Sequence, residues 1–148
     1  EALGETYYRP TVAAQLAQAL YAQERYEEAE AFAMASSAAA SSEDVISQLL
    51  WRAAQAKVLA RRGLAAEAEE LARRALALAE GIDLPNMRGD VLLGLADVLC
   101  LSARRQEAIP YVEEALRLFQ RKGNVVAARR ARAWLGEHDL GGEEGAAS

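Results

Sequence analysis

Few side chains in this sequence could perform catalysis. It contains one cysteine, Cys100, and one histidine, His138. A cysteine nucleophile needs a base beside it, and a zinc site needs several Cys, His or acidic ligands. The sequence has no glycine-rich phosphate loop, no dinucleotide fingerprint and no nucleophile elbow. We therefore expect a protein that is not an enzyme and carries no cofactor or metal, with Cys100 an inert thiol and His138 exposed.

Acidic residues form the other clusters that could do chemistry. Two groups of three glutamates occur about 40 residues apart: Glu27, Glu28 and Glu30, and then Glu67, Glu69 and Glu70. Paired carboxylates act as general acid and base only where their surroundings separate their pKa values. Neither group has a base or a metal ligand close to it in the sequence. We interpret both groups as solvated helix surface.

Charge is distributed unevenly along the chain. The net charge is −5, which disfavours a nucleic-acid partner because phosphate neutralisation needs surplus Lys and Arg. Residues 1–42 carry six glutamates and two arginines, whereas residues 115–136 carry six basic residues and no acid. Such a polarised molecule could associate head to tail or present its basic end to an acidic neighbour. A nucleic-acid contact through the segment from Arg117 to Arg132 is the weaker hypothesis.

Composition also predicts the compartment. No apolar run approaches the roughly 18 residues that a membrane span requires, so we expect no membrane partner. One cysteine fits a reducing compartment, which favours a cytoplasmic location. The chain begins with Glu1 rather than Met, and we interpret it as part of a longer protein.

An internal repeat is the strongest signal in the sequence. Three segments share a small residue, a leucine three positions later, an alanine nine positions after that and a small residue seven positions further on. The three sets are Ala17, Leu20, Ala29 and Ser36; Ala56, Leu59, Ala68 and Ala75; and Ala96, Leu99, Ala108 and Ala115. Two helices approach closely only where the side chains at their crossing are small. The pattern therefore predicts closely packed helical hairpins, with the alanines at the crossings and the leucines in the core.

Breaks in the apolar pattern give the expected elements. Helices are predicted near residues 8–23, 26–39, 45–62, 65–80, 86–103, 106–121 and 125–135. Asp44, Asp83 and Asn124 are candidate N-caps, and four glycines mark helix ends: Gly63, Gly81, Gly123 and Gly136. The expected organisation is a lead-in (1–7), a helical repeat domain (8–136) and a disordered tail (137–148). The domain comprises units near 8–42, 45–82 and 86–123 and a capping helix at 125–135.

The repeat resembles the tetratricopeptide repeat (TPR) proteins, whose unit has small residues at its eighth, twentieth and twenty-seventh positions and a large one at the eleventh. Two features depart from that family: the period is about 40 rather than 34 residues, and the proline that closes each unit is missing. The resemblance implies an all-α fold, an α–α superhelix of about three helical hairpins and a C-terminal capping helix. A narrower similarity is to the C-terminal helical arrays of large bacterial signalling proteins, which carry nucleotide cyclase and ATPase modules.

The resemblance also implies a binding surface, because the first helices of such units line a concave groove. The candidate groove residues are Gln18, Tyr21, Lys57, Arg61, Leu93 and Asp97, with Ala14, Ala53 and Cys100 beside them. The Lys and Asn clamp with which some TPR proteins hold a C-terminal carboxylate is missing. The expected function is a protein–protein interaction or scaffold module that binds a peptide or a neighbouring domain. The alternatives are self-association as a homodimer, and a spacer whose inner surface binds nothing.

Overall fold

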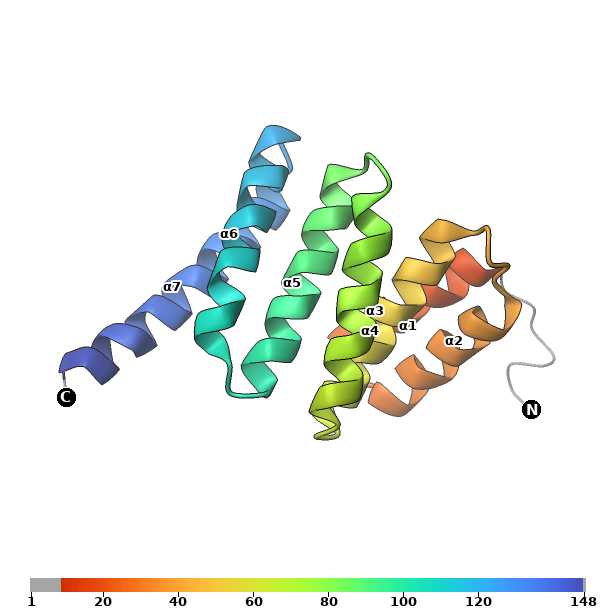
Figure 1. The fold of residues 1–148 in the computed structure, drawn as a ribbon, viewed down its shortest axis with the longest axis horizontal. Coiled ribbons are helices and arrows are strands. Elements are labelled where there is room, and N and C mark those ends of the chain that lie inside the picture. The colour runs from red at the N-terminus through yellow and green to blue at the C-terminus, as the bar shows by residue number, and fades with distance from the viewer. Residues whose placement is uncertain (1–8, 148) are drawn as a thin grey trace.

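The computed structural model describes the backbone of residues 9–147 and the side chains of residues 9–136, so the expected lead-in (1–7) lies outside it. Residues 9–147 form seven α-helices and no β-strand, which confirms the all-α class (Figure 1). The helices are α1 (Pro10–Ala22), α2 (Tyr26–Ala39), α3 (Val45–Arg61), α4 (Ala65–Glu80), α5 (Pro85–Leu101), α6 (Arg105–Arg121) and α7 (Val125–Ala147).

Helices that follow one another in the chain pack side by side. The contacts pair α1 with α2, α3 with α4, and α5 with α6, and each pair also contacts the helix that follows it. The odd-numbered helices pack on one another as well, since α3 contacts both α1 and α5. Helices α1, α3 and α5 therefore form one row that joins successive hairpins, and this row carries all six predicted groove residues.

Four of the tight turns share one backbone geometry. The residue after the C-cap has positive φ in each turn: Glu24 (61°), Gly63 (82°), Ala103 (60°) and Gly123 (71°). The next N–H then donates to the carbonyl five residues earlier: Arg25 to Leu20 (2.9 Å), Leu64 to Leu59 (3.0 Å), Arg104 to Leu99 (2.8 Å) and Asn124 to Phe119 (2.8 Å). This is the Schellman motif, which satisfies carbonyls at a helix end. The predicted helix ends at Gly63 and Gly123 are confirmed.

Helix starts and the final helix end agree less uniformly with the sequence. Asp44 Oδ1 accepts from the Ser47 N–H at 3.1 Å, and Asn124 Oδ1 accepts from the Ala127 N–H at 3.1 Å, so both N-caps are confirmed. Asp83 is not a cap, because α5 begins after Leu84. The helix end predicted near residue 135 is wrong: α7 continues past Gly136 to Ala147, where the sequence predicts a tail. Glycine inside a helix costs only about 1 kcal/mol, and no proline interrupts this stretch.

The predicted small residues lie at the helix contacts. Ala29, Ala68 and Ala108 are completely buried. Among the repeat leucines, Leu20 and Leu99 are buried, and Leu59 packs partly exposed against the cluster that contains Leu99. Small side chains thus let the paired helices approach closely, as the repeat predicts.

One glycine has a packing role that the sequence reasoning missed. Gly89 lies inside α5, and a β-carbon there would meet the ring of Phe119, 2.6 Å from Cζ and closer still to Cε1. Phe119 is the largest completely buried side chain among the described residues. The absence of a side chain at Gly89 therefore lets α6 place this ring directly against α5.

Candidate protein-binding surface

Three polar side chains lie at equivalent places on successive odd-numbered helices. They are Gln18 on α1, Lys57 on α3 and Asp97 on α5, separated by 39 and then 40 residues. Lys57 Nζ donates to Gln18 Oε1 at 2.6 Å. Asp97 Oδ1 accepts from Trp134 Nε1 of α7 at 3.2 Å, so the row continues onto the last helix. The helices thus present polar side chains at equivalent places, joined in the pairs Gln18–Lys57 and Asp97–Trp134.

Lys57 is a cation in a largely desolvated position. Its Nζ lies 4.8 Å from the centre of the Tyr21 ring, a cation–π contact. Burial lowers the pKa of the Lys57 ammonium, while the carboxylates of Asp97 and Asp90 act in the opposite direction. The two acids lie across the surface from Lys57 and favour its charged form.

Tyr21 connects Lys57 to Arg61, one turn further along α3. Arg61 Nε donates to the Tyr21 hydroxyl oxygen at 3.2 Å, and its guanidinium lies 5.8 Å from the centre of the Tyr26 ring. Burial raises the pKa of the Tyr21 hydroxyl, and Arg61 partly opposes that shift. The tyrosine is therefore a neutral group that positions two cations along α3.

A pocket of about 290 Å³ opens beside Lys57, between α3, α5 and α7. It is lined by Lys57, Asp90, Leu93, Gly94, Asp97, Arg130, Ala133 and Trp134. Arg130 pairs with Asp90 at 3.3 Å at its edge. A β-carbon at Gly94 would meet nothing within 4 Å, although the residue itself is buried. Gly94 therefore faces the open space of the pocket.

The six predicted groove residues are brought together. Lys57, Leu93 and Asp97 line the pocket, whereas Gln18, Tyr21 and Arg61 join it through hydrogen bonds and ring contacts. Two residues expected beside them are placed differently: Ala14 and Ala53 are buried.

The sequence reasoning missed the contribution of α7. Its pocket residues are Arg130, Ala133 and Trp134. A signal was present, because Arg130 follows Asp90 by 40 residues and Trp134 follows Asp97 by 37. The repeat of about 40 residues thus extends into α7, for which the sequence predicts only a capping helix.

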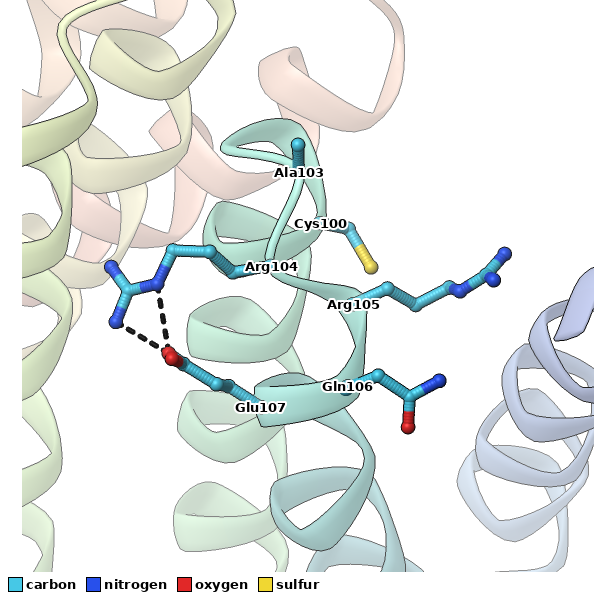
Figure 2. A pocket seen from close by; sticks show the side chains of 6 residues that line it. All are labelled: Cys100, Ala103, Arg104, Arg105, Gln106 and Glu107. Atoms are coloured by element: carbon cyan, nitrogen blue, oxygen red, sulfur yellow. Dashed lines mark hydrogen bonds and ion pairs between the residues drawn. The ribbon is translucent and has the colours of Figure 1, made fainter.

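The cysteine lies beside a wider hollow of about 700 Å³ at the α5–α6 turn, lined by Cys100, Ala103, Arg104, Arg105, Gln106 and Glu107. In Figure 2, Arg104 and Glu107 point toward each other and away from Cys100 and Arg105. Burial raises the pKa of the Cys100 thiol, which keeps the sulfur protonated and a poor nucleophile at neutral pH. His138 lies beyond the described side chains.

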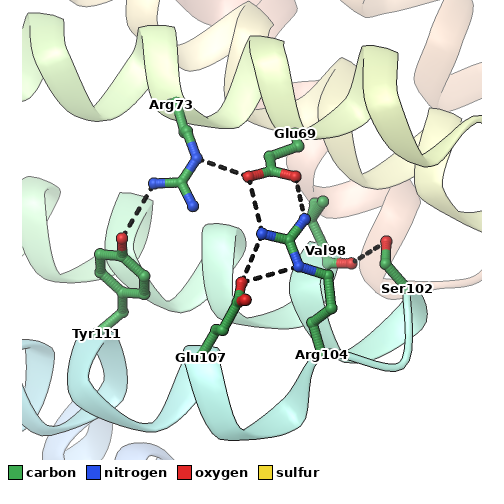
Figure 3. A network of polar contacts seen from close by, with 7 residues as sticks. All are labelled: Glu69, Arg73, Val98, Ser102, Arg104, Glu107 and Tyr111. Carbon is green, nitrogen blue, oxygen red and sulfur yellow. Dashed lines mark hydrogen bonds and ion pairs between the residues drawn. The ribbon is translucent and has the colours of Figure 1, made fainter.

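Two of the glutamates interpreted as solvated surface are instead parts of contacts between hairpins. Glu69 on α4 pairs with Arg73 at 2.7 Å and with Arg104 at the start of α6 (Figure 3). Arg73 also donates to the Tyr111 hydroxyl at 3.0 Å, and the two arginines lower the pKa of Glu69. The polar contacts in Figure 3 therefore join the second hairpin to the third.

Glu30 on α2 makes the corresponding contact one unit earlier. It pairs with Arg62 at 2.7 Å and accepts from Gln55 Nε2 at 2.9 Å. The hydrogen bond from Gln55 lowers the pKa of Glu30. The surface interpretation fails for Glu30 and Glu69 because each lies where an arginine of the next unit reaches it.

Neither metal ligation nor a membrane span is found in the part of the chain that the structure describes. No three His, Cys, Asp or Glu side chains there are grouped so that they could hold a metal ion. None of the helices described has both the length and the apolar character needed to cross a membrane.

Comparison with known families gives a match over most of the chain. The family model AvrB_AvrC, described as an avirulence protein, matches residues 14–120, which is more than half of the chain. The chain belongs to the AvrB_AvrC family. Neither the comparison with curated proteins nor the comparison with solved structures gave a match.

The AvrB_AvrC assignment corrects two interpretations of the sequence. The resemblance to TPR proteins is wrong, and so is the narrower similarity to bacterial signalling proteins. The physical reason is that any row of closely packed helical hairpins needs small residues at regular intervals, so the repeat does not distinguish families. The 40-residue period and the missing proline were the departures that pointed away from TPR proteins.

The AvrB_AvrC match covers most of the candidate surface. It includes all six predicted groove residues and ends before α7. The pocket is therefore built from helices inside the matched segment and completed by one helix beyond it.

Proposed function

We propose that this AvrB_AvrC family member is a non-catalytic protein-interaction module that binds a peptide segment in the pocket between α3, α5 and α7. The observation that carries the proposal is the lining of that pocket. Cations, carboxylates and an indole face the same space of about 290 Å³. Ligand pockets combine apolar walls with a few polar groups that fix orientation.

The proposal includes an arrangement of the hairpins as an α–α superhelix with the odd-numbered helices on its inner face. Packing of α3 against α1 and α5 supports it, as do the polar contacts that recur at intervals of about 40 residues. Stacked helical pairs of this kind offer extended inner surfaces for binding. The pocket would then lie on the inner face.

Each wall of the pocket would recognise a different part of the peptide. Lys57 can donate to a backbone carbonyl and Asp97 can accept from a backbone N–H, because both line the same cavity. Trp134 and Leu93 provide apolar surface for a side chain of the peptide. The family description names no reaction, substrate or partner, so the proposal depends on this geometry.

The test is to fill the pocket without altering the backbone. Gly94→Leu adds a side chain that points into the cavity, whereas Gly136→Leu adds the same side chain to an exposed position on α7 with no neighbour within 4 Å. Peptides selected from a random phage-displayed library on the 148-residue chain are synthesised and measured by calorimetry. We expect affinity to fall about tenfold or more in Gly94→Leu and to remain unchanged in Gly136→Leu. Failure to select any peptide, or equal affinity in both variants, contradicts the proposal.

Self-association is a second candidate, favoured by two apolar side chains. Val125 and Val126 at the start of α7 are 62% and 73% exposed, next to the basic residues of that helix. Light scattering at increasing protein concentration tests it. A dimer that Val126→Lys returns to a monomer supports self-association, and a wild-type monomer at the highest concentration excludes it.

A further inference from the structure

We infer that a second pocket, at the start of α5 and the end of α6, binds a phosphate group. This pocket has a volume of about 380 Å³ and is lined by Arg88, Glu114, Arg117, Leu118 and Arg121. It shares no lining residue with the peptide pocket proposed above. We refer to it as the arginine pocket.

Positive charge in the arginine pocket exceeds what the chain itself neutralises. Three guanidinium groups face one carboxylate. Arg88 Nη2 donates to Glu114 Oε2 at 3.0 Å, whereas Arg88 Nε is enclosed without an acceptor. Among the described residues, neither Arg117 nor Arg121 has an ion pair. The pocket therefore offers two uncompensated cations one helical turn apart.

Helix-end electrostatics explains only part of this cluster. A cation at the C-terminal end of a helix is favourable, which accounts for Arg121 as the last residue of α6. Arg88, however, lies near the start of α5, where the helix dipole is positive and the first turn carries no acid. An anion placed between the two helices would be attracted by all three arginines and by the α5 terminus.

The chemistry of the arginine pocket favours a phosphate group over a carboxylate. Guanidinium groups match phosphate oxygens in bidentate geometry, and a dianion can pair with Arg117 and Arg121 together. A carboxylate would neutralise only one of them. No aromatic ring lines the pocket, so nothing there would stack on a nucleotide base. The group is therefore either phosphate itself or a phosphorylated side chain.

The experiment titrates the 148-residue chain with three probes. They are a phosphoserine peptide, the same peptide without the phosphoryl group, and inorganic phosphate. Arg117→Gln with Arg121→Gln removes the two unpaired cations, and Arg129→Gln with Arg132→Gln removes the same charge from exposed positions on α7. We expect the first variant to weaken binding roughly tenfold or more and the control to change it less than about threefold.

A third variant distinguishes a specific pocket from a merely basic surface. Glu114→Gln removes the carboxylate that competes for Arg88 and keeps a similar shape. We expect it to tighten phosphate binding severalfold, by roughly a factor of five. Binding of the phosphopeptide alone identifies a phosphorylated partner as the ligand, and equal binding of inorganic phosphate identifies the free ion. Absence of binding by both, or equal losses in the two double-arginine variants, overturns the inference.

Discussion

At the scale of single residues, Lys57 is a charged side chain whose desolvated position costs stability, and the proposed peptide binding would explain why it is there. Burial lowers the pKa of its ammonium. Folding therefore shifts the protonation equilibrium of Lys57 toward the neutral amine, and keeping the side chain charged costs folding free energy. Its direct contacts are the Gln18 amide oxygen and the Tyr21 ring, neither of which carries a formal charge. Residues of this kind are found where function requires a charge that the fold does not.

Replacing Lys57 by methionine tests that interpretation. Met keeps the length of the side chain and removes the desolvated charge, so we expect Lys57→Met to increase the free energy of unfolding at neutral pH by about 1 kcal/mol. Because the lowered pKa lies in the folded state, this gain should shrink as pH rises through that pKa toward the ordinary value of 10.5. Urea denaturation measures both effects. A destabilised Lys57→Met variant would instead make Lys57 part of the structural framework.

Gly89 gives the residue-scale prediction for the core. Gly89→Ala forces a methyl group against the Phe119 ring, and we expect a loss of about 1–3 kcal/mol in the free energy of unfolding despite the better helix propensity of alanine. Gly94→Ala in the same helix meets no atom within 4 Å, so it should be neutral or slightly stabilising. Equal midpoints of thermal unfolding for the two variants would show that α5 and α6 move apart without cost.

At the scale of the elements, the sequence was sufficient for most helix boundaries. The six helices from α1 to α6 begin and end within about two or three residues of the predicted positions. The ends of α3, α4 and α6 coincide with Gly63, Gly81 and Gly123, and glycines at such places are visible in a sequence. The end of α7 was not predictable in this way, because Gly136 has space on every side and is tolerated within the helix.

Contacts between elements were less accessible to sequence reasoning. Gln18, Lys57 and Asp97 were expected to share a surface only because of the resemblance to TPR proteins, although they do recur at intervals of 39 and 40 residues. The ion pairs of Glu30 and Glu69 with arginines were not predicted, because the partners lie 32 and 35 residues away. Whether these side chains meet depends on how the turns between the helices are oriented. Gly89 was missed for the same reason, since its partner is on the next helix.

The contact made by Glu69 predicts how stability depends on pH. Arg104 and Arg73 lower its pKa below the ordinary value of 4.5, so its contribution is present above that value and is lost as pH falls through the folded-state pKa. We expect Glu69→Gln to reduce the free energy of unfolding by about 1 kcal/mol at pH 7 and to approach wild type as the pH is lowered below 4.5. Glu67→Gln, on the exposed side of α4, is the matched control and should have no effect over the same pH range. A pH-independent loss in Glu69→Gln would assign its role to packing alone.

At the scale of the whole molecule, the repeat and α7 together determine where the pocket lies. Each hairpin contributes one polar side chain to the row on the odd-numbered helices, and α7 supplies the indole and guanidinium that close the pocket. The class of fold followed from the small residues, whereas the family did not, because the same small residues suit many helical arrays. The arginine pocket lies on different side chains, so the two sites can be tested independently.

The most direct test of peptide binding uses the two tryptophans of the chain. The Trp134 indole N–H lies in the pocket and donates to Asp97, whereas the Trp51 indole N–H donates to Gln48 on α3 and does not line the pocket. In a ¹H–¹⁵N correlation spectrum, titration with a selected peptide should shift the Trp134 indole resonance and leave that of Trp51 in place. A Trp134 resonance that does not move when the peptide is bound would contradict binding at this pocket.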